Sequence, residues 1–310
     1  MPTFNDIINE AAALGNGSDV VRRKYIRGLH EVTGRNVIVY YSAWLQKPIP
    51  DLMPILQVND NDKNGFMATI HQLDRRLGLD LVLHTPGGDA TATESLVQYL
   101  RQMFGKDIRA IIPHLAMSAG TMIALSCREV VMGKESNLGP IDPQIGTLPA
   151  HGIIDEFKRA AQEIAGAKDE RERAAKIAVW QPIIAKYTPA LIGECQHAIT
   201  WSSEVVSSWL VSGMFDGDPK AEEKVKKIVD GLGGHAVTKT HARHIHADRL
   251  KDLGVKVVAL EDDQKLQDAV LTVHHACTHT LATTQAVKII ENQNGVSFMI
   301  AAQLVQRQAS

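Results

Sequence analysis

The sequence has few of the features that mark several large classes of protein. Its three cysteines, Cys127, Cys195 and Cys277, stand singly and far apart among 310 residues. A disulfide framework or a zinc knuckle needs cysteines at short, regular spacings, so we expect neither, and three buried thiols instead. No apolar run approaches the roughly 18 residues that a membrane-spanning helix requires, so no membrane span is expected.

An excess of positive charge is also lacking. Lysine and arginine number 33 against 35 acidic residues, a net charge of −2, and no basic block interrupts the sequence. The phosphate attraction that sustains nucleic-acid binding is therefore missing, and we expect no nucleic-acid partner. Asp6 and Glu10 lie where a signal peptide carries lysines, which predicts a cytoplasmic protein.

Signatures of metal and nucleotide binding are absent as well. His235, His241, His244 and His246 lie close together in sequence, but their spacing matches no metal-ligand pattern. No G-x-x-x-x-G-K-[ST] phosphate loop occurs, so the chain has no such motif with which to hydrolyse ATP. We expect no metal and no other cofactor.

What the sequence does contain is an alternation of short apolar runs and helical patterns. The 45% apolar content can fill one large core with a smaller appendage. This alternation predicts an α/β protein with a parallel sheet covered by helices. The predicted strands are residues 36–41, 79–84, 108–112, 129–132 and 255–260, and the first predicted helices are residues 66–77 and 91–104.

Later segments differ in character. A helical region over residues 151–209 is broken near Pro182 and Pro189, and its part at 160–176 predicts a solvated helix or an inserted arm. Residues 213–234 are typical of a junction, and residues 264–292 predict a final amphipathic helix. We therefore expect an N-terminal helical segment (1–35), a catalytic core (36–215), and a C-terminal region with a strand and a long helix (216–310).

Two motifs carry the chemistry. Residues 81–89 read LVLHTPGGD, so an apolar strand runs into glycines that leave backbone N–H groups unpaired. Residues 116–121 read AMSAGT, which places Ser118 at the start of a helix. Ser118 can be an ordinary helix cap or a nucleophile. The Pro-Gly-Gly turn upstream favours the nucleophile, because it adds the oxyanion hole that acyl transfer also needs.

These motifs, followed by NLGPIDPQ at 137–144, resemble the Clp-fold serine proteases. The resemblance is greatest to the serine dehydrogenase proteinase family, which is distantly related to signal peptide peptidase A. It is specific over residues 36–145 and looser beyond, although 240–245 (THARHI) and 248–255 (DRLKDLGV) also resemble that family's C-terminal pattern. The resemblance implies a Clp/crotonase superfamily fold of stacked ββα units with helical extensions, and a homo-oligomer.

The resemblance also assigns roles to individual residues. It implies that Ser118 is the nucleophile and that the oxyanion hole consists of the N–H groups of Gly88 and Ala119. The predicted substrate-binding residues are Gly87, Leu138 and Gly139.

The general base is open at this point. Clp proteases use a histidine that would fall in residues 136–144, where none occurs. Relatives of signal peptide peptidase use a lysine, for which Lys186 in an apolar context is the first candidate and Lys158 the second, since desolvation favours the neutral amine. A set of Asp142 with His241 or His235 is the remaining alternative.

Three functions remain open. The first is an ATP-independent serine peptidase that cleaves peptides or unfolded proteins through an acyl-enzyme on Ser118, with any unfoldase as a separate partner. The second is an acyl-CoA enzyme of the crotonase type, which shares the fold and the oxyanion hole. The third is a scaffold of the same fold without catalysis.

Overall fold

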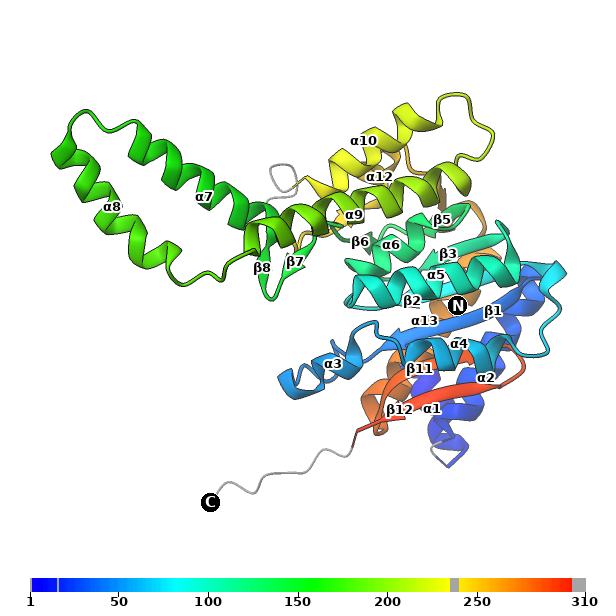
Figure 1. Cartoon of the computed structure of the whole chain (residues 1–310). Helices are drawn as coiled ribbons and strands as arrows, with labels where there is room; N and C mark the ends of the chain where they lie inside the picture. The colour runs from blue at the N-terminus through cyan, green and yellow to red at the C-terminus, as the bar shows by residue number, and fades with distance from the viewer. Residues whose placement is uncertain (1, 16, 235–239, 303–310) are drawn as a thin grey trace, which may run out of the picture.

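A seven-stranded mixed sheet forms the centre of the molecule (Figure 1). The computed structural model describes residues 2–15, 17–234 and 240–302. The strand order is β10-β5-β3-β2-β1-β11-β12. These strands are β1 (Asn36–Ser42), β2 (Leu79–His84), β3 (Ile108–Ile112), β5 (Glu129–Met132), β10 (Val257–Ala259), β11 (Ala286–Asn292) and β12 (Ser297–Ala301). Five strands from β10 to β1 run parallel, whereas β11 and β12 pair antiparallel.

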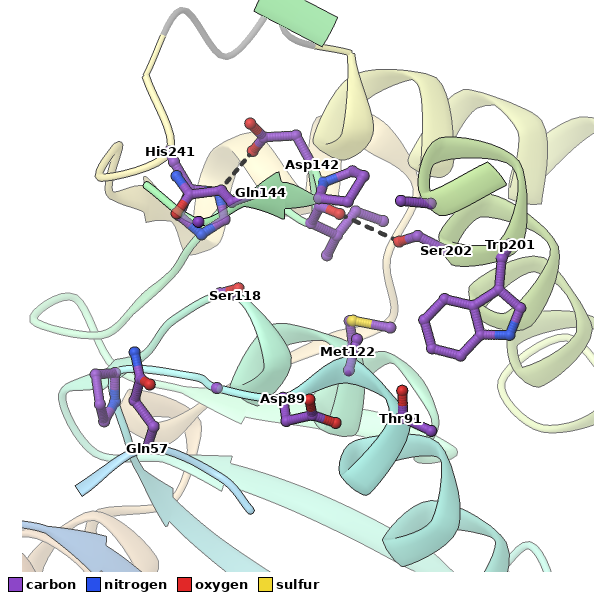
Figure 2. A pocket seen from close by; sticks show the side chains of 17 residues that line it. Gln57, Asp89, Thr91, Ser118, Met122, Asp142, Gln144, Trp201, Ser202 and His241 are labelled. Carbon is purple, nitrogen blue, oxygen red and sulfur yellow. Dashed lines mark hydrogen bonds and ion pairs between the residues drawn. The ribbon is translucent and has the colours of Figure 1, made fainter. Parts of the chain in front are cut away.

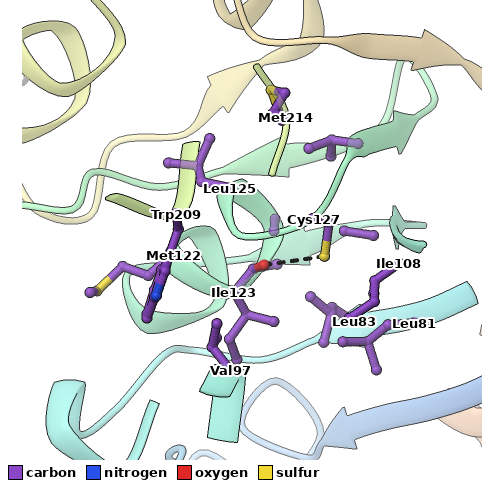
Figure 3. Packing of buried hydrophobic residues seen from close by; sticks show 14 of the residues in the cluster. Leu81, Leu83, Val97, Ile108, Met122, Ile123, Leu125, Cys127, Trp209 and Met214 are labelled. Carbon is purple, nitrogen blue, oxygen red and sulfur yellow. Dashed lines mark hydrogen bonds between the residues drawn. The ribbon is translucent and has the colours of Figure 1, made fainter. Parts of the chain in front are cut away.

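Helices cover both faces of this sheet. Every residue of β1 is buried, and its side chains alternate between two cores: Ile38 and Tyr40 face one, and Val37 and Val39 face the other. Figure 3 shows the first core, where Leu81 of β2 packs with side chains of the covering helices. That face carries α4 (Asp62–Ile70), α5 (Ala90–Phe104), α6 (Ala119–Leu125), α9 (Leu191–Ser212), α10 (Ala221–Gly233) and α12 (Ala247–Leu253). Near the opposite face lie α1 (Phe4–Ala13), α2 (Ser18–Thr33), α3 (Met53–Leu56) and α13 (Gln264–Thr283).

Smaller elements stand at the carboxyl ends of the parallel strands. A second sheet of three short strands has the order β4-β6-β9, and a two-stranded hairpin joins β7 to β8. Their bounds are β4 (Leu115–Ala116), β6 (Asn137–Leu138), β7 (Gln144–Ile145), β8 (Leu148–Pro149) and β9 (Ile245–His246). The described residues also include three short 3-10 helices, η1 (Pro50–Leu52), η2 (Arg75–Leu77), which precedes β2, and η3 (Leu260–Asp262).

A helical arm projects from this body, as the sequence predicts for residues 160–176 (Figure 1). The arm consists of α7 (Ala150–Ala165) and α8 (Glu170–Ile184), which form an antiparallel helical hairpin. Trp180 is buried between them and donates a hydrogen bond to Glu163 at 2.8 Å.

The structure confirms the α/β class and corrects three expectations. The sheet is mixed rather than parallel, because residues 286–292 form β11 and do not continue the last helix. Every residue of β11 is buried, and its valine and two isoleucines are β-branched residues, which favour a buried strand over a helix. The helix predicted over 66–77 already ends at Ile70, and the junction predicted at 213–234 contains α10.

The three-part division of the chain stays a prediction, although β11 and β12 from its last part join the same sheet as β1. The three cysteines are free and buried, as expected. Within the described ranges, no helix is both long and apolar enough to cross a membrane.

Three imidazole rings gather at the carboxyl end of β2. The His84 ring lies 5.3 Å from that of His274 and 5.6 Å from that of His114, measured between centroids, and Trp44 packs on it at 4.3 Å. Burial is the main cause that lowers the pKa of His84 well below its usual value and that of His274 to about 3. The neighbouring imidazoles lower both further, because charging one ring disfavours charging the next.

We predict that acid destabilises the protein through these rings. In the unfolded chain His84 and His274 take up protons as the pH falls below about 6.5, whereas the folded state keeps them neutral, so stability is present above that pH and lost below it. One such histidine contributes a loss on the order of 2 kcal/mol between pH 6.5 and about pH 5. Urea unfolding of wild type, His274→Gln and the exposed-site control His71→Gln measures this loss. We expect the loss of stability with falling pH to be smaller in His274→Gln than in wild type and unchanged in His71→Gln. If His274→Gln loses as much stability as wild type, the prediction is wrong.

Candidate active site

Ser118 occupies a strained turn directly before α6. Its backbone has φ 50° and ψ −113°, a region that residues other than glycine rarely adopt. Such strain costs about 1–3 kcal/mol and is concentrated at functional sites. The Ser118 side chain makes no capping hydrogen bond to α6, so the interpretation of this serine as a helix cap is wrong. The hydroxyl instead lines a cavity of about 490 Å³.

The Pro-Gly-Gly turn borders the same cavity, because Gly88 lines it. A parallel backbone bridge joins Gly88 to Val58. The N–H of Val58 donates to the carbonyl of Gly87 at 2.8 Å, and the N–H of Asp89 donates to the carbonyl of Val58 at 2.9 Å. A parallel bridge uses the groups on either side of Gly88, so the N–H of Gly88 itself points away from Val58. Among the described residues, no acceptor bonds the N–H of Gly88 or of Ala119.

Close approach explains the two glycines. A Cβ on Gly88 would overlap the backbone nitrogen and oxygen of Val58. A Cβ on Gly87 would lie 2.7 Å from the Cβ of Ser118 and 2.6 Å from the carbonyl oxygen of Met117. Both turns can therefore meet only where side chains are missing, as the sequence predicts for this pair of motifs.

The segment after β6 forms the next layer. Gly139 packs against the Ser118 turn, with its N–H held by the Thr121 hydroxyl at 2.9 Å, and Leu138 is fully buried in the core. Neither they nor Gly87 line the cavity among the residues that the structure describes. Direct substrate contact by Gly87, Leu138 and Gly139 stays a prediction.

Asp142 and His241 stand on the opposite wall of the cavity from Ser118 (Figure 2). His241 Nδ1 lies 2.9 Å from Asp142 Oδ1; the Asp142 carboxylate is fully buried and the His241 ring is 22% exposed. With Nδ1–H donated to the carboxylate, Nε2 is left as an acceptor. The described residues show no hydrogen bond between Ser118 and the ring, and such bonds are often long without substrate.

The two lysines lie elsewhere. Lys158 is on the helical arm, exposed and paired with Asp155 at 3.8 Å, and Lys186 is exposed just beyond the end of α8. Neither lines the Ser118 cavity in the described part of the chain. His235, the other histidine considered, falls outside the described residues.

A second hollow adjoins the first. Its volume is about 750 Å³, and its walls include the apolar side chains of Trp44, Leu45 and Met117. Both hollows share Pro86, Gln144 and His241 in their linings. His241 therefore lies at the boundary between the hollow that Ser118 lines and this second hollow.

Comparison with known proteins gives the family. Residues 16–179 match the family model described as ClpP-like SDH-type serine proteinase. The chain belongs to this family. Two uncharacterized proteins of Methanocaldococcus jannaschii are similar to it. One is 33% identical over 76% of this chain and 71% of its own length. The other is 29% identical over 63% of this chain and 59% of its own length.

The family match includes some of the site and not the rest. Ser118, Gly88 and Asp142 fall within residues 16–179, whereas His241 lies beyond them. The expectation of a member of the serine dehydrogenase proteinase family is thus confirmed, and the roles of individual residues stay predictions.

Sequence reasoning missed part of the cavity. Trp201 and Ser202 of α9 line one end, and Gln57 lines the other. No motif marks these residues, because each reaches the cavity only through the packing of distant elements. Asp89, just after the glycines, caps α5, since its carboxylate accepts from the N–H of Ala92 at 2.7 Å.

We predict that Gly88→Ala slows labelling of Ser118 by a fluorophosphonate more than about 100-fold, because the new Cβ must push the turn away from Val58. Gly105→Ala is the matched control. Gly105 has φ 62° but nothing within 4 Å of a Cβ, so it tests backbone strain alone. The labelling rates of the two variants are compared, and thermal unfolding checks that both are equally stable. A Gly88→Ala protein that reacts as fast as wild type would refute the prediction.

Proposed function

We propose that this chain is an ATP-independent serine peptidase that uses Ser118, His241 and Asp142. One observation carries the proposal: a serine on a strained turn faces a carboxylate-oriented histidine across a single cavity. The family supports a serine proteinase. We prefer His241 to Lys186 as the base because only His241 lines this cavity among the described residues.

Acylation begins when His241 Nε2 takes the proton of Ser118 Oγ. The oxygen attacks the peptide carbonyl, and the N–H groups of Gly88 and Ala119 stabilise the negative charge on the carbonyl oxygen. Asp142 holds the ring in the required tautomer and stabilises the imidazolium. The C–N bond then breaks as His241 gives its proton to the departing amine, and water hydrolyses the acyl-enzyme with the same base.

The shape of the groove favours an extended substrate. Two neighbouring hollows of about 490 and 750 Å³ share His241 in their linings, and together they offer room for a chain of a few residues. A folded protein offers no such free segment, so we propose peptides or unfolded proteins as substrates. A homo-oligomer is a further prediction of the family resemblance, and any unfoldase would be a separate partner because the sequence contains no phosphate-loop motif.

A fluorophosphonate probe tests this assignment. We expect it to label wild type and Ser202→Ala, whose serine lines the same cavity, but not Ser118→Ala. Labelling of Ser118→Ala equal to wild type would sink the proposal.

Variants of the base give the second test. His241→Ala and Asp142→Asn are expected to lower kcat/KM for a peptide more than ~10³-fold, since a triad acts as a unit. Lys186→Ala and Lys158→Ala should stay within about threefold of wild type. The opposite pattern, with a dead Lys186→Ala and an active His241→Ala, would establish the lysine base instead.

A further inference from the structure

Lys288 is a fully buried lysine in the middle of β11. Its ammonium nitrogen lies 2.7 Å from Asp62 Oδ1 and donates a hydrogen bond to the carbonyl of Gln57 at 2.8 Å. The ammonium also stands 5.6 Å from the centre of the Tyr40 ring. Burial lowers the pKa of Lys288, and the neighbouring Asp62 carboxylate opposes that shift.

Asp62, at the start of α4, is equally buried and fully engaged. Its second oxygen accepts from the Tyr40 hydroxyl at 2.8 Å and from the N–H of Asn59 at 3.0 Å. One ion pair therefore holds two points of the loop between α3 and α4, the carbonyl of Gln57 and the N–H of Asn59.

The residue between those two points is Val58. Its backbone faces the other way and forms the bridge to the Pro-Gly-Gly turn, with both hydrogen bonds at 2.8–2.9 Å. Ser42 adds a third hold, because its hydroxyl donates to the carbonyl of Leu56 at 2.6 Å. A continuous path of short contacts thus runs from Lys288 through Gln57 and Val58 to Gly88.

Stability alone is a weak explanation for such a pair. The cost of taking two charges out of water often cancels their attraction, so apolar residues of similar volume can hold a core as well. What an apolar pair lacks is hydrogen-bond direction. Only a donor at position 288 and an acceptor at position 62 can hold both the carbonyl of Gln57 and the N–H of Asn59 in place.

We propose that Lys288 and Asp62 are positioning residues that set the N–H of Gly88 at the oxyanion site through the Gln57–Asn59 loop. This inference rests on the proposed peptidase function and adds to it a part of the chain beyond the family match at residues 16–179. Neither side chain lines the cavity, so their effect passes through the backbone.

The strand offers a matched control. Glu291 lies on the opposite face of β11 and forms another fully buried ion pair, with Arg22 at 2.5 Å. Arg22 lies on α2, and Arg23 of the same helix also binds Glu291 at 2.7 Å; among the described residues, no hydrogen bond joins these side chains to the Gln57–Asn59 loop. The Arg22–Glu291 pair shares the strand and the burial of the Lys288–Asp62 pair but not the path to Gly88.

The experiment compares two neutralised pairs, Lys288→Met/Asp62→Asn and Arg22→Met/Glu291→Gln, in the full chain. Changing both partners avoids leaving one buried charge uncompensated. We expect kcat for a peptide to fall about 10- to 100-fold in the first variant, with KM within about threefold, because a displaced donor weakens binding of the transition state. The second variant should keep kcat within about threefold at equal thermal stability.

Hydrogen exchange provides a readout independent of activity. The amides of Val58 and Asp89, which form the bridge, should exchange at least ~10-fold faster in Lys288→Met/Asp62→Asn than in wild type, relative to amides at the centre of β2. Unchanged exchange at both amides, or an unchanged kcat, overturns the positioning role. A wild-type protein that no fluorophosphonate labels would overturn the peptidase proposal instead, and exchange would still decide whether the ion pair holds the turn.

Discussion

The parallel bridge between Val58 and Gly88 is the contact on which the site depends. It is a backbone interaction, so no side chain selects it, and it forms only because Gly88 has no Cβ to collide with Val58. By using the groups on either side of Gly88, the bridge turns the N–H of Gly88 away from Val58, and no acceptor among the described residues bonds it. The geometry that would stabilise an oxyanion is therefore a by-product of how two loops pair.

Around this bridge the site draws on parts of the chain that are far apart. The Ser118 turn follows β4, Asp142 follows β6, and His241 precedes β9. β6 pairs with both β4 and β9, which brings the segments that carry these residues to one edge of the molecule. Because parallel strands end at a common edge, residues distant in sequence can line one cavity there.

Much of the fold was predictable from local patterns. β2, β3 and β5 have the bounds that their apolar runs predict, since buried parallel strands need apolar residues on both faces. The end of α13 was not predictable, because the residue pattern over 286–292 fits a helix or a strand. Only the pairing of this segment with β1 makes it a strand. In the site, Gly88 and Ser118 followed from motifs. Local sequence favours the lysines over the pairing of His241 with Asp142, because nothing in sequence measures the distance between residues so far apart.

The sequence by itself determined the α/β class, the glycine turn and the serine, because each depends on local conformation: glycine permits close approach, and apolar alternation with turn residues marks the strands. Tertiary structure alone decided which polar group faces the serine. It placed the lysines on or beside an exposed arm and His241 in the cavity, and it buried Lys288 behind the turn. These are matters of distance between elements, which packing of the two cores sets and local sequence does not encode.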